Sequence, residues 1–167
     1  MKEIYTDYAR YNLWANRRMA DAFASLTEAD QERRVESSFP SAKLTFLHIW
    51  DAEYLWLQRL QGVSPQTFPS RTFQGTAAEA VAVMLDCSAD FQRYVEDLPP
   101  ALFDKTLHFK TISFGEQSQK AHEMIHHCLN HSTYHRGQLV TIGRQLGLIN
   151  IPATDFMYYL RIEKNKV

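Results

Sequence analysis

The chain contains 167 residues, a length typical of one domain, and its 45% apolar and 13% aromatic content is sufficient for a hydrophobic core, which excludes a disordered protein. The formal net charge is -1 and no long basic run is present, so the electrostatic signature of nucleic-acid binding is missing. No apolar run approaches the length of a membrane span, and the charged N-terminus is unlike a signal peptide. We therefore expect one soluble, cytoplasmic domain over residues 1–167, with neither a membrane nor a nucleic-acid partner.

The N-terminal part of the chain has the pattern of two long helices. Apolar residues recur in steps of three and four from residue 2 to about residue 25, which predicts an amphipathic helix. The stretch 27–30 resembles a capping box and predicts a short helical turn. A second long helix is expected over residues 42–61, with Ser41 as its N-cap and Gly62 at its end.

Two further long helices are expected in the second half of the chain. After a Pro- and Ser-containing loop over residues 62–75, Thr76 and Glu79 form a capping box that begins the third helix, and Pro99-Pro100 ends it. The fourth runs from about residue 118 to residue 146, with Gly147 after its last turn.

The segment before the fourth long helix and the C-terminal tail have weaker patterns. Residues 106–114 alternate enough for an extended segment or a short hairpin, with Gly115 at its turn and His108 at its edge. In the tail, Thr154 is a candidate N-cap for a short helix that packs on the bundle. These elements predict an all-α four-helix bundle with a short extra C-terminal helix, in which the third connection is either a crossover or a simple reversal.

Five of the seven histidines lie between His122 and Gly147. His127, His131 and His135 recur every four residues, a spacing that places them on one face of a helix. Two imidazoles at i and i+4 can bind one divalent ion. The outer pair is about 12 Å apart, so only two of the three can serve, and the spacing does not choose between 127/131 and 131/135.

A third ligand has to come from another element. His48 is the candidate, because it lies in an apolar helical segment that is expected to face the bundle; the alternative is a core histidine that binds a backbone carbonyl. Cys128 precedes His131 by three residues, about 60° around the helix, and is expected with Cys87 to be a small buried residue.

Four groups of residues, spread along nearly the whole chain, form recognisable motifs, and the motif of the fourth helix is the most specific. They are Tyr11-Asn12-Leu13-Trp14-Ala15-Asn16, His48 with Glu53 and Trp56, Asn130-His131-Ser132-Thr133-Tyr134-His135-Arg136-Gly137-Gln138, and Pro152-x-Thr154-Asp155-Phe156. On these residues the sequence resembles the DinB-like (DinB/YfiT) family of bacterial four-helix-bundle metalloproteins.

The resemblance implies an up-down-down-up bundle, frequent homodimers, and a divalent metal held by His48, His131 and His135. Some relatives are metal-dependent thiol S-transferases or isomerases that use low-molecular-weight thiols. Imidazole ligands favour zinc or nickel. His127 is then expected to line the pocket or to bond a ligand ring, and Gly137 to leave room beside the lower ligand for a neighbouring helix or a substrate.

Three protein ligands leave a metal position open, which favours an enzyme over a closed structural site. We expect a metal-dependent enzyme of the thiol S-transferase or hydrolase type that acts on a small molecule. The alternative is a non-catalytic, stress-related protein whose metal is a structural staple. Glu53 is a weakly placed candidate base, about 140° around the helix from His48.

Side chains near the histidines are expected to form the walls of the site. Trp50, Tyr54 and Tyr134 are the candidates for an apolar pocket over the open metal position. Tyr134 and Asn130 flank the ligand face, where packing or capping is the alternative to orienting a substrate or a water molecule.

Overall fold

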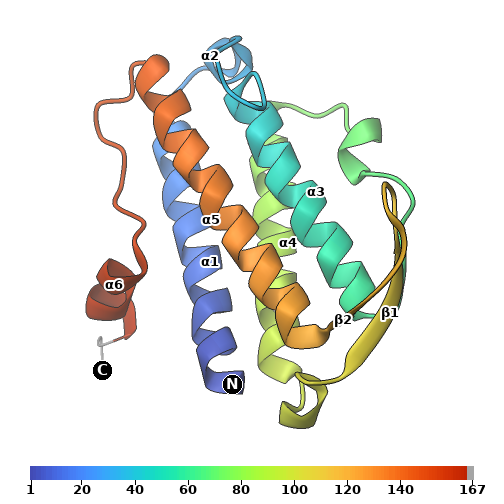
Figure 1. The fold of residues 1–167 in the computed structure, drawn as a ribbon. Helices are drawn as coiled ribbons and strands as arrows, with labels where there is room; N and C mark the ends of the chain where they lie inside the picture. Colours follow the sequence, from blue (N-terminus) through green and yellow to red (C-terminus); the bar gives the residue numbers. More distant parts are fainter. Residues whose placement is uncertain (165–167) are drawn as a thin grey trace.

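The computed structural model describes residues 1–164 and contains four long helices. They are α1 (Lys2–Phe23), α3 (Ala42–Leu60), α4 (Ala77–Asp97) and α5 (Ala121–Gln145) (Figure 1). The shorter elements are α2 (Glu28–Glu32), 3₁₀ turns at Pro69–Thr72 and Pro100–Leu102, the strands β1 (Thr106–Thr111) and β2 (Gly115–Lys120), α6 (Phe156–Tyr159) and a π-helical turn at Leu160–Lys164. The predicted all-α bundle with a short C-terminal helix is confirmed.

The long helices pack in the cyclic order α1, α4, α3, α5. Following the chain in Figure 1, α1 runs up, α3 and α4 run down, and α5 runs up again. Because α3 and α4 are parallel neighbours, the loop over residues 61–76 is the connection that crosses over along the bundle. The connection between α4 and α5 contains the β1–β2 hairpin and reverses the chain direction, so it is not a crossover.

Local signals set most helix ends where the sequence predicts them. The Ser41 hydroxyl accepts a hydrogen bond from the backbone N–H of Leu44 at 3.2 Å, and Thr76 and Glu79 form a reciprocal capping box. Gly62 and Gly147 have φ angles of 86° and 89°, so each takes the left-handed conformation that ends a helix.

The fourth long helix, α5, begins at Ala121, three residues later than expected. The hairpin causes the difference, because residues up to Lys120 pair with β1, where Lys120 lies opposite Thr106. The backbone N–H of Lys120 then donates to the Glu123 carboxylate at 3.0 Å, and the helix starts there.

The expected cap of the C-terminal helix was one residue off. Asp155, not Thr154, accepts a hydrogen bond from the backbone N–H of Tyr158, at 2.9 Å. The Thr154 carbonyl instead accepts from the Tyr11 hydroxyl at 2.6 Å, which holds the tail against α1.

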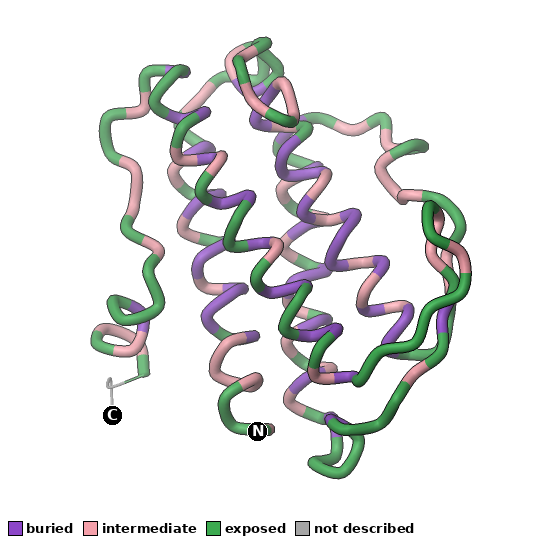
Figure 2. Tube along the Cα trace, viewed as in Figure 1, coloured by how far each residue is buried: buried purple, intermediate pink, exposed green. Residues whose placement is uncertain are grey.

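Buried residues line the inner faces of the four long helices (Figure 2). Most of the apolar ones form two large clusters, one around Phe91, Phe103 and Leu129 and the other around Phe23, Phe46 and Ile142. A third, small cluster joins Tyr11 and Ala15 of α1 to Tyr159 of α6.

A layer of buried polar residues separates the two large clusters. On each long helix the polar positions lie between the residues of one cluster and those of the other. The layer consists of Asn12, Asn16, Glu53, Ser88, Ser132 and Arg136. Within residues 1–164, none of the helices combines the length and the apolar content that a bilayer crossing requires.

Candidate metal centre

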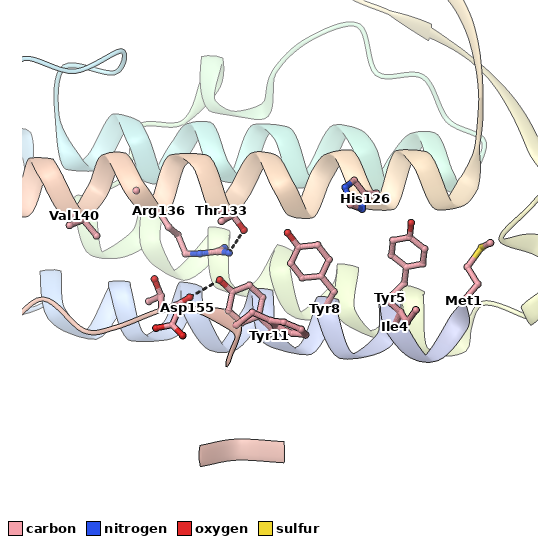
Figure 3. A pocket seen from close by; sticks show the side chains of 13 residues that line it. Met1, Ile4, Tyr5, Tyr8, Tyr11, His126, Thr133, Arg136, Val140 and Asp155 are labelled. Atoms are coloured by element: carbon pink, nitrogen blue, oxygen red, sulfur yellow. Dashed lines mark hydrogen bonds between the residues drawn. The ribbon is translucent and has the colours of Figure 1, made fainter. Parts of the chain in front are cut away.

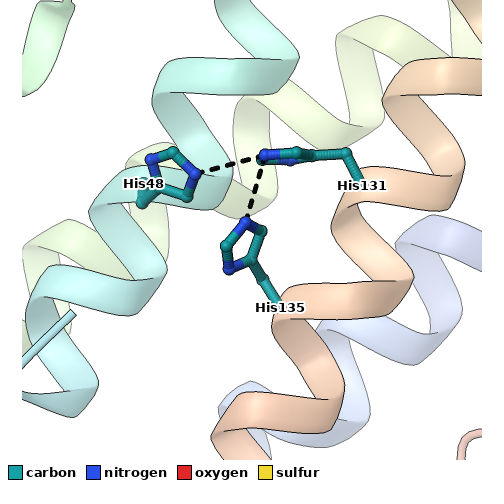
Figure 4. Close-up of side chains that lie close together, drawn as sticks. All are labelled: His48, His131 and His135. Carbon is teal, nitrogen blue, oxygen red and sulfur yellow. Dashed lines mark hydrogen bonds between the residues drawn. The ribbon is translucent and has the colours of Figure 1, made fainter. Parts of the chain in front are cut away.

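Three histidine side chains from two helices meet between α3 and α5. The Nε2 atom of His131 lies 3.2 Å from Nε2 of His48 and 3.1 Å from Nε2 of His135. One ring nitrogen of each histidine falls within 4.8 Å of the other two. Figure 4 shows His48 on α3 facing the two α5 rings, which are one helical turn apart.

Aromatic packing holds the first of these rings in place. Phe39, from the segment between α2 and α3, stacks on His48 with ring centroids 4.0 Å apart, and its centroid lies 5.6 Å from that of His135 in an edge-on contact. The Phe39 side chain therefore closes one side of the histidine cluster. Sequence analysis did not find this role, because a Phe before a Pro in a loop has no pattern that indicates a ligand contact.

Gln138 orients the imidazole of His135. Its side-chain oxygen lies 2.8 Å from Nδ1 of His135, and its amide nitrogen donates to Ser38 at 2.9 Å and to the Tyr134 hydroxyl at 3.2 Å. Since the Gln138 oxygen accepts, Nδ1 of His135 carries the proton and Nε2 presents its lone pair to the cluster. Tyr134 is thus connected to the site through Gln138, although its own side chain is largely exposed.

His131 has no satisfactory hydrogen-bonding arrangement without a cation. Its Nδ1 atom is buried and has no hydrogen-bond partner among the described residues 1–164, while its Nε2 atom faces two other Nε2 atoms. A proton on Nδ1 leaves a buried donor unpaired and directs the Nε2 lone pairs of His131 and His135 at each other. A proton on Nε2 satisfies only one neighbour and leaves Nδ1 as an unpaired acceptor.

A divalent ion fits this arrangement. In a tetrahedral zinc site, nitrogen ligands at 2.0–2.1 Å from the ion are about 3.4 Å apart, which is close to the two Nε2 separations here. Burial, followed by the neighbouring histidines, lowers the pKa of His48 to about 4 and that of His131 to about 3. Burial also lowers the pKa of His135. At neutral pH all three rings are therefore in the neutral form that binds metals.

A cavity of about 350 Å³ adjoins the histidine cluster along the groove between α3 and α5. His48 and His131 form one end, and its other walls include Trp56, Arg59, Phe68, Phe114 and His127. Phe114 comes from the tip of the β1–β2 hairpin, so the hairpin covers part of this pocket.

A model of the DinB family matches residues 1–167, the whole chain. The chain belongs to the DinB family. It is also similar to Protein DinB of Bacillus subtilis (strain 168), with 26% identity over 161 residues that cover 93% of each chain.

His127 of this DinB-family chain lies beside the cluster and outside it. Its ring centroid is 6.0 Å from that of His131 and 4.8 Å from that of Trp56, against which it packs edge-on. Burial, then the charge of Arg59, lowers its pKa. The structure therefore brings together the 131/135 pair and places His127 in the pocket wall, as the resemblance implied.

None of the three expected wall residues, Trp50, Tyr54 and Tyr134, lines the pocket. Trp50 packs edge-on against Phe73. The wall residue is Trp56, which is about 80° around α3 from His48, whereas Trp50 and Tyr54 are about 160° and about 120° away. Tyr134 is edge-on to His135, with ring centroids 4.9 Å apart.

Glu53 belongs to the polar layer and not to the metal centre. It is fully buried and accepts hydrogen bonds from Asn12 at 2.7 Å, Asn16 at 3.2 Å, Ser132 at 2.8 Å and Ser88 at 2.5 Å. Arg136 donates to the oxygens of the same two asparagines, at 2.6 and 2.9 Å. The asparagines thus link a buried carboxylate to a buried guanidinium, which leaves Glu53 no access to a substrate.

The remaining sulfur and imidazole candidates are also outside the site. Cys128 and Cys87 are buried, as expected, and burial raises the pKa of each thiol. The ring of His122 binds the Phe103 carbonyl at 2.9 Å, and His108 is exposed on the hairpin. Asn130 is also exposed.

A larger groove, of about 1050 Å³, lies on the other side of α5, between α5, α1 and the C-terminal tail. Figure 3 shows Tyr5, Tyr8 and Tyr11 of α1 along it, opposite His126 of α5. It includes none of the three clustered histidines. Gly137 lines this groove, and a Cβ atom there would meet nothing within 4 Å, so the expectation that Gly137 makes room beside the lower ligand was wrong.

Proposed function

We propose that this DinB-family protein binds one divalent ion, zinc or nickel, through Nε2 of His48, His131 and His135. The observation that carries the proposal is the convergence of three neutral ring nitrogens around His131, whose own hydrogen bonding is incomplete. Gln138 supplies the outer hydrogen bond that orients one ligand ring, as is usual for metal-bound histidine.

We further propose that the protein is an enzyme of the thiol S-transferase or hydrolase type. With three protein ligands, a bound ion supplies an open position at which it deprotonates a thiol or polarises an electrophile near neutral pH. The chain supplies the pocket for the small molecule: Trp56 and Phe68 provide apolar walls, and the exposed Phe114 lies at its rim.

The alternative is a structural staple, in which the ion joins α3 to α5 and no substrate binds. Because the histidines come from both helices, a bound ion would stabilise the fold whether or not the protein is an enzyme. The adjacent cavity favours the enzyme, because a closed structural site has no need of an aromatic-walled pocket beside it.

Cobalt substitution tests both parts of the proposal. Untagged protein, loaded with cobalt and freed of excess ion, should contain about one equivalent and show a visible spectrum that changes when small thiols are added. Well under half an equivalent contradicts the metal centre. A full equivalent with a spectrum insensitive to thiols, together with no metal-dependent turnover of thiol conjugates or esters, supports the staple instead.

We also propose that the protein is a homodimer, as the family resemblance implies. Light scattering coupled to size-exclusion chromatography should give twice the 19.4 kDa mass of the chain. A monomer mass across the micromolar range contradicts this.

A further inference from the structure

Arg59, at the end of α3, is a buried cation that has no ion-pair partner within residues 1–164. Its residue surface is 5% exposed, and its Nε atom is buried without a hydrogen bond. Within residues 1–164, no carboxylate forms an ion pair with its guanidinium. Burying a charge in this way is costly unless something compensates it, and burial indeed lowers the pKa of Arg59.

The other deeply buried arginine shows how this fold satisfies the terminal nitrogens of such a group, although within residues 1–164 its Nε atom also lacks a hydrogen bond. Arg136 is 2% exposed and donates to Asn12, Asn16 and Thr133 at 2.6 to 2.9 Å. Through the two asparagines it is also connected to Glu53. Within residues 1–164, Arg59 has no equivalent network, so the N–H donors of its two terminal nitrogens are available to a molecule in the pocket, while its Nε atom is buried.

The position of Arg59 shows that such a molecule would bind in the pocket beside the histidine cluster. Arg59 lines the same pocket as the histidine cluster and lies eleven residues after His48 on the same helix, an axial rise of about 16 Å. The arginine side chain leans back towards the start of the helix, which brings the guanidinium to roughly 10 to 15 Å from the cluster. The pocket therefore has a metal centre at one end and a cation at the other.

Aromatic rings hold the guanidinium in place. Its carbon lies 4.8 Å from the ring centre of Trp56 and 5.5 Å from that of Phe109, on β1. Packing against two rings restricts the plane of the group without using its N–H donors. A fixed planar fork of this kind matches the two oxygens of a carboxylate or phosphate.

We propose that Arg59 binds an anionic group, a carboxylate or a phosphate, at the end of the substrate remote from the metal. The inference rests on the proposed function, since it names the class of molecule that the three-histidine site acts on: a small elongated anion whose reacting thiol or electrophile is separated from its charge by about six bonded atoms. Arg59 is then a residue that determines specificity and takes no part in the chemical step.

Matched pairs of thiols test this by binding to the cobalt-loaded protein. The probes are 6-mercaptohexanoate, 6-mercaptohexylphosphonate and the neutral 6-mercaptohexanol, with 3-mercaptopropionate as a short anion. The spectral titration should show that one or both long anions bind about 10- to 100-fold more tightly than the neutral thiol, as expected for a charge-assisted hydrogen-bonded pair. The long anion preferred by the pocket identifies its charged group. The short anion should show no such preference.

Substitutions then assign the preference to Arg59. Arg59→Met, which keeps the apolar contacts, should remove the anion preference and leave the affinity for 6-mercaptohexanol within about twofold, while Arg59→Lys should restore part of it. A purely structural role would weaken all of the thiols together. Equal binding of anionic and neutral thiols by the wild type, or an unchanged preference in Arg59→Met, overturns the proposal.

A metal-free titration separates this proposal from the proposed function. If the cobalt spectrum responds to no thiol at all, the metal chemistry fails, and Arg59 is judged from tryptophan fluorescence of metal-free protein, since Trp56 lies against its guanidinium. Hexanoate or hexylphosphonate should then quench the wild type and not Arg59→Met, with hexanol as the neutral control. Absence of this difference rules out the anion site independently.

Discussion

At His131, two features of the side chain meet that a core histidine does not combine: an Nδ1 atom without a hydrogen-bond partner among residues 1–164 and an Nε2 atom shared between two other rings. His127, one turn earlier on α5, has the same spacing from His131 as His135 has. Only the latter directs a ring nitrogen at the cluster, because Gln138 holds its Nδ1 atom.

Alanine substitutions should therefore separate the two i, i+4 neighbours of His131. His135→Ala removes one of three ligands and should weaken metal binding by more than 100-fold, beyond the usual effect of losing an outer-shell partner. His127→Ala should leave the stoichiometry at one and change the affinity less than tenfold. Calorimetric titration with zinc measures both. A reversed order of the two effects would show that the 127/131 pair holds the ion.

At the same scale, Glu53 should matter for stability and not for metal binding. Glu53→Ala leaves four donors without their acceptor and Arg136 without its counter-charge, a loss of roughly 3–5 kcal/mol. Urea unfolding measures this loss, with Glu53→Gln as the milder control because it keeps one acceptor oxygen. Loss of metal from a folded Glu53→Gln protein of unchanged stability would instead place this side chain at the metal centre.

At the scale of elements, three faces of α5 border three different parts of the molecule. One face of it carries the ligand pair, another contributes Ser132 and Arg136 to the polar layer, and a third borders the large groove beside α1. The small residues Gly137 and Gly143 lie on this helix six positions apart, and their surroundings differ.

Alanine at the two glycines should have opposite consequences. At Gly137 a Cβ meets nothing within 4 Å, so Gly137→Ala should stabilise the fold by about 0.5–1 kcal/mol through helix propensity. At Gly143 a Cβ would lie 3.1 Å from side-chain atoms of Ile151 and Leu148, so Gly143→Ala should gain less or lose stability. Thermal unfolding compares the two variants. Destabilisation by Gly137→Ala would mean that something occupies the space beside it in solution.

At the scale of the whole molecule, the three-histidine cluster couples stability to pH. In the unfolded chain His48 and His131 have ordinary pKa values of 6.5, whereas burial lowers those values to about 4 and about 3 in the folded protein. At pH values between the unfolded and the folded pKa, the unfolded chain binds more protons than the folded protein does. The stability that the neutral histidines contribute is therefore complete above pH 6.5 and decreases as the pH falls.

Metal-free protein should accordingly lose stability on acidification from pH 6.5 to about pH 4, by at most about 1.4 kcal/mol per pH unit for each histidine, less the screening by solvent at these partly exposed rings. The control is the His48→Gln, His131→Gln double variant, in which carboxylate titration is unchanged and the contribution of these two histidines is absent. Urea unfolding at several pH values gives the difference. Parallel pH profiles for the two proteins would contradict the prediction.

The sequence by itself determined what depends on local physics. Helical periodicity, the caps at Ser41 and Thr76 and the terminating Gly62 and Gly147 lie within a few residues of the ends that they set, so most helix bounds follow from them. The family motif on α5, together with His48, likewise identified the three histidines that the structure brings together.

Only the tertiary structure decided which side chains surround that cluster. The contact of Phe39 with His48, the place of Glu53 in the polar layer, the wall formed by Trp56 and the lack of an ion-pair partner for Arg59 within residues 1–164 all depend on how far α3 is rotated and shifted against α5 and the hairpin. These offsets arise from packing between residues far apart in the chain. Such contacts leave no periodicity in either segment, because each helix buries a face of the same width whichever neighbour covers it.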